Sequence, residues 1–217
     1  MGRHTLMLYI CLALALLDLV AIGVGATLPD LYLRPLVLVC MSFTVLLGGR
    51  SRPSILLAVG LFAAAFLEIF QMLGAHLKLV ALGTAAYYLT YSVAFIIRGG
   101  PIQRRGLVGF ALIGAFAIAM FLWLNPYGFL RFPSIVYTLV LILFIGLAVR
   151  PLLQSGPTES SKWMGIAAIA LLISDSLRAI SIFKSPVPEV ITLAFYWLGQ
   201  FSLVRSSHFF IENKNHT

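Results

Sequence analysis

The sequence predicts an all-α, polytopic membrane helix bundle with eight transmembrane helices and both termini on the cytoplasmic side. Its 217 residues are 61% hydrophobic and 10% charged, whereas an ordinary soluble domain is about 45–50% apolar. The apolar residues form consecutive runs of roughly 20, the length of a helix that crosses a bilayer. Basic residues gather in every second loop between these runs, which indicates how the chain is oriented.

Eight apolar runs define the expected helices within a single integral membrane domain, residues 1–217. The first run carries Asp18, which argues against a cleaved signal peptide and favours a first helix. Clusters such as GGRSRP at 48–53 and NPYG at 125–128 separate later runs, because glycine and proline interrupt helices. The predicted spans are 5–26, 33–49, 55–74, 76–98, 106–124, 133–153, 162–183 and 187–208.

The distribution of basic residues predicts the orientation of the helices. Ten Lys or Arg residues lie on the side of the two termini and four on the opposite side, while Arg178 lies inside a span. Loops rich in Lys and Arg stay in the cytoplasm, so both termini are expected there. A missed or extra helix would remove this asymmetry, so the pattern also favours an even number of helices.

The charge and the cysteines exclude several classes of site. The net charge of +8 comes from loops between apolar runs, which favours contact with membrane lipids and argues against nucleic acid. Cys11 and Cys40 lie inside apolar runs without a neighbouring histidine. We therefore expect no metal site, no disulfide and no cofactor.

Three carboxylates lie inside predicted spans: Asp18, Glu68 and Asp175. A charged side chain at the bilayer centre costs roughly 2.5–3.5 kcal/mol on insertion scales, so each should face the bundle interior. Each lies 12 or 13 residues from the cytoplasmic end of a helix that runs outward. At about 1.5 Å per residue, the three carboxylates are expected at one level, roughly 18–20 Å from the inner surface.

The helices that run back are expected to bring more polar groups to this level. Tyr196 and Gln200 are four residues apart, and Glu68 and Gln71 are three apart, so the members of each pair share a helical face. The sequence therefore predicts one polar layer that forms an intramembrane site. The groups expected from the returning helices are Arg34, Tyr88, Tyr137, Tyr196 and Gln200.

Purely structural roles are also open for some of these residues. Asp175 and Arg178 share a helical face and could simply neutralise each other. Asp18 could hydrogen-bond a neighbouring helix without taking part in chemistry, and tyrosines such as Tyr91 could serve only as packing aromatics. Ser174 has no histidine partner and no G-x-S-x-G motif, which argues against a serine hydrolase.

Sparse but ordered matches to a known family pattern run from about residue 33 to 205. The most specific is the intact Ser174-Asp175 pair. The sequence departs from the pattern at Leu67-Glu68, where Gly-Asp is expected, and at Tyr88, where His is expected. The other matching residues are Arg34, Pro35, Leu36, Gly60, Leu61, Tyr91, Pro133, Tyr137, Phe183, Tyr196 and Gln200.

On these residues the chain resembles the YhhN-like lysoplasmalogenases, as a divergent, bacterial-type member. The resemblance implies an eight-helix hydrolase of the bacterial inner membrane that needs no cofactor. Its substrates would be lysophospholipids with a vinyl ether bond, the lysoplasmenyl-ethanolamines and lysoplasmenyl-cholines. Cleavage would release a fatty aldehyde and a glycerophospho-headgroup.

Vinyl ether hydrolysis requires a carboxylic acid to protonate carbon and a carboxylate to stabilise the resulting cation or activate water, much as two carboxyls divide the work in glycosidases. Glu68 has no cation on its own helix, so burial favours its protonated form and the role of acid. Asp175, with Arg178 one turn away, would be the base. Arg34 would hold the phosphate. The other expected substrate-binding residues are Tyr88, Tyr137, Ser174, Arg178, Tyr196 and Gln200. Further candidates for the site are Asp18, Gln71 and Tyr91.

Two other functions agree with the same residues. Buried carboxylates also serve as proton relays, so a proton-coupled transporter is one alternative. A non-catalytic lipid-binding relative is the other, because the changes at Leu67, Glu68 and Tyr88 could mark lost chemistry.

Overall fold

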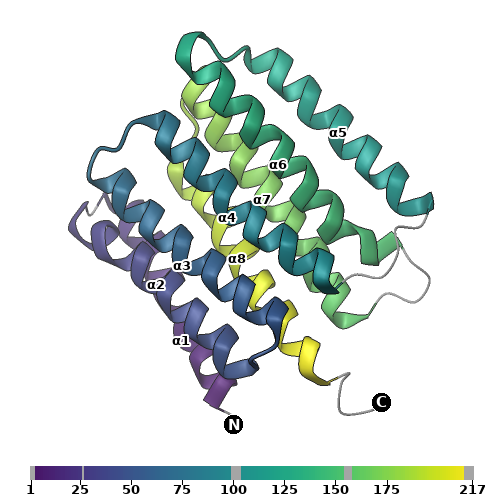
Figure 1. The fold of residues 1–217 in the computed structure, drawn as a ribbon. Helices are drawn as coiled ribbons and strands as arrows, with labels where there is room; N and C mark the ends of the chain where they lie inside the picture. The colour runs from purple at the N-terminus through teal and green to yellow at the C-terminus, as the bar shows by residue number, and fades with distance from the viewer. Residues whose placement is uncertain (1–2, 26, 99–103, 154–157, 213–217) are drawn as a thin grey trace.

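The computed structural model describes residues 3–25, 27–98, 104–153 and 158–212 (Figure 1). Within these ranges the protein is helical and has no β-strand, which confirms the predicted all-α class. The α-helices are α1 (Arg3–Gly23), α2 (Thr27–Gly48), α3 (Arg52–Met72), α4 (Leu77–Arg98), α5 (Arg104–Leu124), α6 (Arg131–Val149), α7 (Glu159–Phe183) and α8 (Glu189–Glu212). Two short 3-10 helices, Gly128–Leu130 and Arg150–Leu153, flank α6.

Local sequence signals explain where several helices begin and end. Ser51 caps α3 by accepting a hydrogen bond from the Ser54 backbone N–H at 3.3 Å, and Thr158 caps α7 in the same way at 3.2 Å. Such caps satisfy backbone donors that have no partner within the helix. After α5, Asn125 adopts a φ of 47°, a left-handed conformation that asparagine accepts more readily than most residues. The chain can therefore turn sharply before α6.

Six of the helices are long and apolar enough to cross a membrane, and they indicate an integral membrane protein. These are α1, α3, α4, α5, α7 and the continuous segment 128–153 that contains α6. The apolar part of α2, Tyr32–Gly48, is shorter, and α8 carries buried polar residues such as Gln200 and Ser202 that lower its hydropathy. The described part of the chain forms eight α-helices, but the predicted count of eight spans and the cytoplasmic position of the termini stay predictions.

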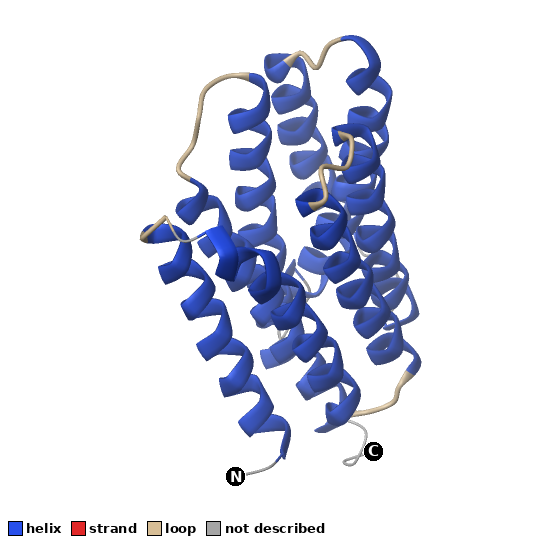
Figure 2. Cartoon of the chain, turned by 90° about the vertical axis from the view of Figure 1, so that its left-hand side faces the viewer, coloured by secondary structure: helices blue, strands red, loops and turns tan. Residues whose placement is uncertain are grey.

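The helices form a closed bundle with one helix outside it. Neighbours pack in the order α1, α2, α3, α4, α6, α7 and α8, and α8 returns to pack against α1 and α2. Helix α5 lies at the edge and packs mainly on α6 (Figure 1). Both termini lie at the same end of the bundle, and short loops join the helices at its two ends (Figure 2).

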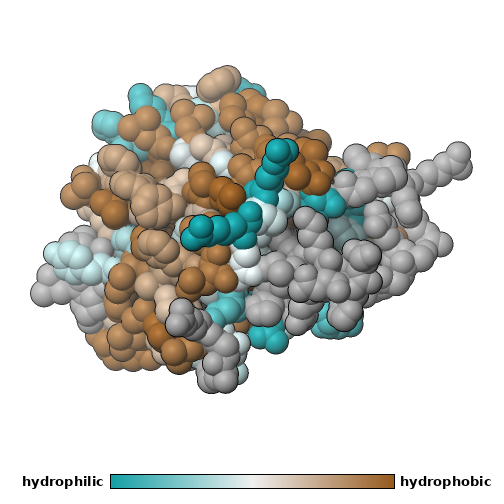
Figure 3. Space-filling view, turned by 60° about the horizontal axis from the view of Figure 1, so that its bottom comes forward, coloured by the Kyte–Doolittle hydropathy of each residue, from teal (hydrophilic) through white to brown (hydrophobic). Residues whose placement is uncertain are grey.

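The outer surface of the bundle is largely apolar. Large hydrophobic side chains such as Leu16, Phe43, Phe66 and Leu112 are exposed on different helices. Hydrophobic residues also cover much of the described surface in Figure 3, with hydrophilic ones scattered among them. Contiguous exposed apolar surface is unusual for a soluble protein, so this surface suits contact with lipid.

Two glycines allow the helices that carry polar residues to approach closely. A Cβ on Gly60 of α3 would lie 2.4 Å from the ring of Tyr91 on α4. A Cβ on Gly199 of α8 would lie 2.5 Å from the side chain of Leu171 on α7. Because neither position has room for a side chain, both helix pairs depend on glycine for their spacing.

Candidate active site

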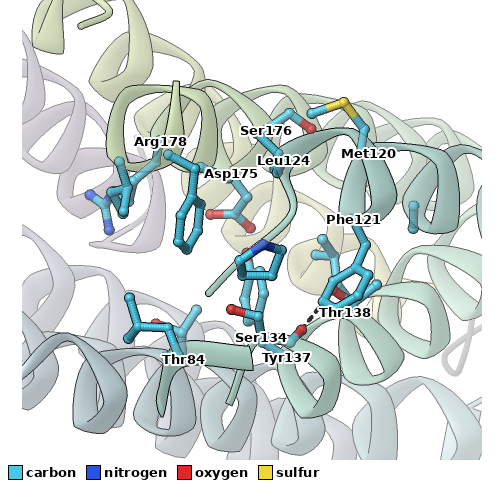
Figure 4. A pocket seen from close by; sticks show the side chains of 18 of the residues that line it. Thr84, Met120, Phe121, Leu124, Ser134, Tyr137, Thr138, Asp175, Ser176 and Arg178 are labelled. Carbon is cyan, nitrogen blue, oxygen red and sulfur yellow. Dashed lines mark hydrogen bonds between the residues drawn. The ribbon is translucent and has the colours of Figure 1, made fainter. Parts of the chain in front are cut away.

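A cavity of about 140 Å³ lies between α4, α5, α6 and α7 (Figure 4). Most lining residues come from the starts of α4 and α6 and the ends of α5 and α7, in the half of the bundle away from the start of α1 (Figure 1). Most of its wall is apolar, with residues such as Phe116 and Met120 of α5 and Leu172 of α7. Asp175 and Arg178 are the two charged residues among those that line it. An apolar cavity with a few convergent polar groups is the usual form of a ligand site.

Asp175 is held at the cavity wall by phenols from two other helices. Its side chain is 8% exposed, and its Oδ2 accepts a hydrogen bond of 2.5 Å from the Tyr88 hydroxyl of α4. The Tyr137 phenol of α6 faces the same carboxylate. Hydrogen bonds of this kind fix the carboxylate and stabilise its charge, so Asp175 is a rigid acidic group at the cavity.

Arg178 lies one helical turn beyond Asp175 and lines the same cavity. In Figure 4 both side chains project from α7 across from Thr84, Ser134 and Tyr137. The guanidinium interacts electrostatically with both Glu68 and Asp175, yet it forms no ion pair with either, nor with any other residue that the structure describes. Nearby carboxylates therefore balance the charge of the Arg178 guanidinium, while its N–H groups form no ion pair with a described residue.

Glu68 interacts with Arg178 but is not among the residues that line the cavity. Its side chain is 4% exposed and belongs to α3. Arg178 interacts electrostatically with Glu68 of α3 as well as with Asp175 of its own helix. Glu68 therefore has Arg178 of another helix within electrostatic reach, and its predicted role as the acid stays a prediction.

Part of the predicted polar layer forms an interior cluster around these groups. Tyr87, Tyr88 and Tyr91 of α4 pack against one another, and Tyr88 also packs on Phe144 of α6. The Tyr91 hydroxyl donates a 3.2 Å hydrogen bond to Oε1 of Gln200 on α8. The layer is continued by Tyr196, which lies in the electrostatic range of Glu68 and Arg178.

Five predicted site residues differ in their relation to the cavity. Gln71 and Tyr137 line it, whereas Tyr196 and Gln200 are buried behind its wall. Ser174, which was expected to bind substrate, donates a 2.9 Å hydrogen bond to the Thr192 carbonyl oxygen. Ser174 thus joins α7 to α8 and is not among the residues that line the cavity.

Asp18 and Arg34 belong to a second polar cluster between α1, α2 and α8. Nη2 of Arg34 donates a 2.7 Å hydrogen bond to Oε1 of Glu189, and Nε of Arg34 lies 3.7 Å from Oδ2 of Asp18. The indole N–H of Trp197 donates to the same Asp18 oxygen at 2.9 Å. Arg34, expected to hold a phosphate, is instead paired with two carboxylates outside the cavity.

A comparison with known families now bears on this geometry. The YhhN family model matches residues 30–207. The chain belongs to the YhhN family. No curated protein and no solved structure matches it. Of the predicted site residues, Asp18 alone lies outside the matched range, which agrees with its position away from the cavity of this YhhN protein.

Several lining residues of the YhhN cavity were missed from the sequence. Thr84, Ser134, Thr138 and Ser176 contribute hydroxyls to its wall, and Oγ1 of Thr138 donates to the Ser134 carbonyl oxygen at 2.7 Å. Uncharged hydroxyl groups are common inside apolar helices and cost little energy to bury. Their presence in the sequence therefore does not indicate a site. The spacing of Ser134 and Thr138 on either side of Tyr137 was the one available hint, because residues four apart share a helical face.

Proposed function

We propose that this YhhN family protein hydrolyses the vinyl ether bond of lysoplasmalogens, single-chain phospholipids taken from the surrounding membrane. The observation that carries the proposal is the position of Asp175, a phenol-bound carboxyl at the wall of a largely apolar cavity between membrane helices. Vinyl ether cleavage needs a carboxyl group next to an apolar chain. A lysophospholipid is therefore the expected partner, and the bacterial cytoplasmic membrane the expected location.

The reaction requires only a carboxyl group and water. Protonated Asp175 would transfer its proton to the terminal carbon of the O–CH=CH unit, which leaves an oxocarbenium ion next to the newly formed carboxylate. Water then adds to the cationic carbon, and the Asp175 carboxylate takes up the proton that the water loses. The resulting hemiacetal collapses to a fatty aldehyde and the free glycerol hydroxyl, so Asp175 ends the cycle protonated, as it began.

The phenols would lower the energy of the charged intermediate state. Tyr88 donates a hydrogen bond to the Asp175 carboxylate, and Tyr137 faces it from α6. Preorganised donors of this kind act most strongly where water is excluded. Tyr137, which lines the cavity, would also lie next to the ether oxygen or the attacking water.

Glu68 takes a different role in this proposal from the one expected from the sequence. It is not among the residues that line the cavity, and it interacts electrostatically with Arg178. Glu68 is then a positioning residue that balances Arg178, while Asp175 meets the substrate. Asp175 is then the carboxyl required for the reaction, and Glu68 affects it only through Arg178.

The proposal is tested with the detergent-purified protein and two lipids that share one headgroup. A lysoplasmenylethanolamine carries the vinyl ether, and its ester-linked counterpart does not. We expect fatty aldehyde from the first lipid, no fatty acid from the second, and no aldehyde from folded Asp175→Asn. Tight binding of both lipids without any product would instead support a non-catalytic lipid-binding protein, and proton-linked flux in proteoliposomes would support a transporter.

A further inference from the structure

We propose that Arg178 is the binding group for the phosphate of a single-chain lipid in this cavity. The inference rests on the proposed function for the lipid class, and it adds the residue that recognises the headgroup. Arginine suits this task because its planar guanidinium presents several N–H donors to phosphate oxygens. The sequence had assigned the phosphate to Arg34, whose donors the structure directs to Glu189.

The first support is the state of the guanidinium. Arg178 lines the cavity, and among the described residues it has no carboxylate within ion-pair distance. Two other arginines of the bundle, Arg34 and Arg98, do have direct partners: Arg34 binds Glu189, and Arg98 donates a 2.7 Å hydrogen bond to Oγ of Ser160. A charged residue without an ion-pair partner at the wall of a cavity inside a membrane protein indicates a functional site.

The second support is the order of groups along α7. Leu172, Asp175 and Arg178 all line the cavity and follow one another at three-residue intervals. Each interval rises about 4.5 Å along the helix, and residues three apart share a face. A lysolipid has the same order of chemistry: an apolar chain, an ether at one end of the glycerol and a phosphate at the other. The chain would then lie beside Leu172, the ether beside Asp175 and the phosphate beside Arg178.

The third support is the charge of the site. Glu68 and Asp175 both lie in the electrostatic range of Arg178, so a ligand with several negative charges would be repelled. A phosphodiester whose headgroup also carries an ammonium group adds no net charge. Ethanolamine and choline lysolipids have this character, and the site is expected to prefer them to anionic lysolipids.

The cavity also provides a way out for the hydrocarbon chain. Its volume of about 140 Å³ is too small for a whole lysolipid, since pockets that enclose drug-sized ligands measure about 300–1,000 Å³. Phe116 of α5 lines the cavity and is 45% exposed on the outer surface. Helices α4 and α5 both contribute to the wall but form no extensive packed interface with each other in the described residues. The chain would therefore pass between α4 and α5 into the bilayer.

The test measures binding without turnover. Its main probe is a saturated 1-O-alkyl glycerophosphocholine, which has no vinyl ether to hydrolyse. The comparison ligands are 1-O-alkylglycerol, which lacks the phosphate, and glycerophosphocholine, which lacks the chain. We expect the detergent-purified protein to bind the first ligand about tenfold or more tightly than either of the others, a difference of about 1.4 kcal/mol or more.

Variants assign this preference to one side chain. Arg178→Gln should remove the preference for the phosphate-bearing lipid, and Arg178→Lys should keep part of it because lysine still offers a point charge. Arg131→Gln is the matched control, since Arg131 is exposed at the start of α6 and should leave all three affinities unchanged. The thermal unfolding of each variant is compared with that of the wild type before binding is measured.

The outcomes separate this inference from the proposed function. Wild-type protein that binds the alkyl phospholipid and the alkylglycerol equally, or folded Arg178→Gln that keeps the preference, would overturn it. Equal binding of glycerophosphocholine would overturn the lipid assignment and indicate a site for free phosphate compounds. If phosphate-dependent binding is found but the vinyl ether is not cleaved, the proposed function fails and the binding site stands.

Discussion

The hydroxyl of Tyr88 on α4 donates a 2.5 Å hydrogen bond to Oδ2 of Asp175 on α7. Tyr88 is one of the positions at which the sequence departs from the expected family pattern, and a histidine was expected there. A phenol and an imidazole can both donate a hydrogen bond to a carboxylate. The departure therefore preserves the contact that fixes Asp175, and it does not by itself mark a loss of chemistry.

We predict that Tyr88→Phe lowers the rate of aldehyde release without unfolding the protein. Loss of a hydrogen bond to a charged group costs about 1.5–3 kcal/mol, which corresponds to a rate about 10- to 100-fold lower. Tyr88→His should keep more activity than Tyr88→Phe. Tyr91→Phe is the control, because the Tyr91 hydroxyl binds Gln200 behind the cavity wall and should matter much less. Full activity in Tyr88→Phe would remove this contact from the mechanism.

The helices were predictable because membrane spans have a fixed length and loops have distinctive residues. The observed helix α4 ends at Arg98 and α5 at Leu124, as the turn clusters after them indicated. Helix α2 begins at Thr27, earlier than the predicted residue 33, because its first turns contain polar residues that lower local hydropathy. Hydropathy thus locates the apolar centre of a helix better than its ends.

The candidate site was predictable only in part, because depth in the membrane does not fix the direction of a side chain. Glu68 and Asp175, expected at one level, do lie around a common arginine. Asp18, expected at the same level, faces Arg34 and Trp197 instead, because α1 lies beside α2 and α8. The contribution of α5 could not be foreseen, since Phe116 and Met120 resemble any other lipid-facing residues in the sequence.

We predict that Glu68→Gln retains catalysis and strengthens the binding of phosphate-bearing lipids. Glu68 attracts Arg178, so its neutral replacement should leave the guanidinium freer to bind an anion, with an affinity gain of about tenfold or less. The kcat for aldehyde release should stay within about tenfold of the wild-type value, whereas Asp175→Asn should lose it by about a thousandfold or more. Equal loss of kcat in both variants would restore Glu68 to the role of acid.

We predict that Asp18 matters for stability and little for catalysis. Its side chain is fully buried, where it accepts a hydrogen bond from Trp197 and lies beside Arg34. Asp18→Ala removes both interactions and should lower the free energy of unfolding by about 3 kcal/mol or more, because Arg34 loses a buried partner. Thermal unfolding and aldehyde release are measured on the same preparation. Asp175→Asn should give the opposite pattern, and a folded, inactive Asp18→Ala would place Asp18 in the mechanism after all.

We predict that the α3–α4 interface behind the site does not accept even one added methyl group at Gly60. A Cβ there would lie 2.4 Å from the ring of Tyr91 and 2.5 Å from Oγ1 of Thr90, and Tyr91 is completely buried and cannot move aside. Gly60→Ala should therefore lower the free energy of unfolding by about 1–3 kcal/mol, the usual cost of overpacking a core.

Gly114→Ala is the matched control in α5, because nothing lies within 4 Å of its added methyl group. Since alanine favours a helix interior over glycine by about 1 kcal/mol, this variant should unfold at an equal or higher temperature. If both variants raise the unfolding temperature in detergent, close approach at Gly60 is not what holds α3 against α4.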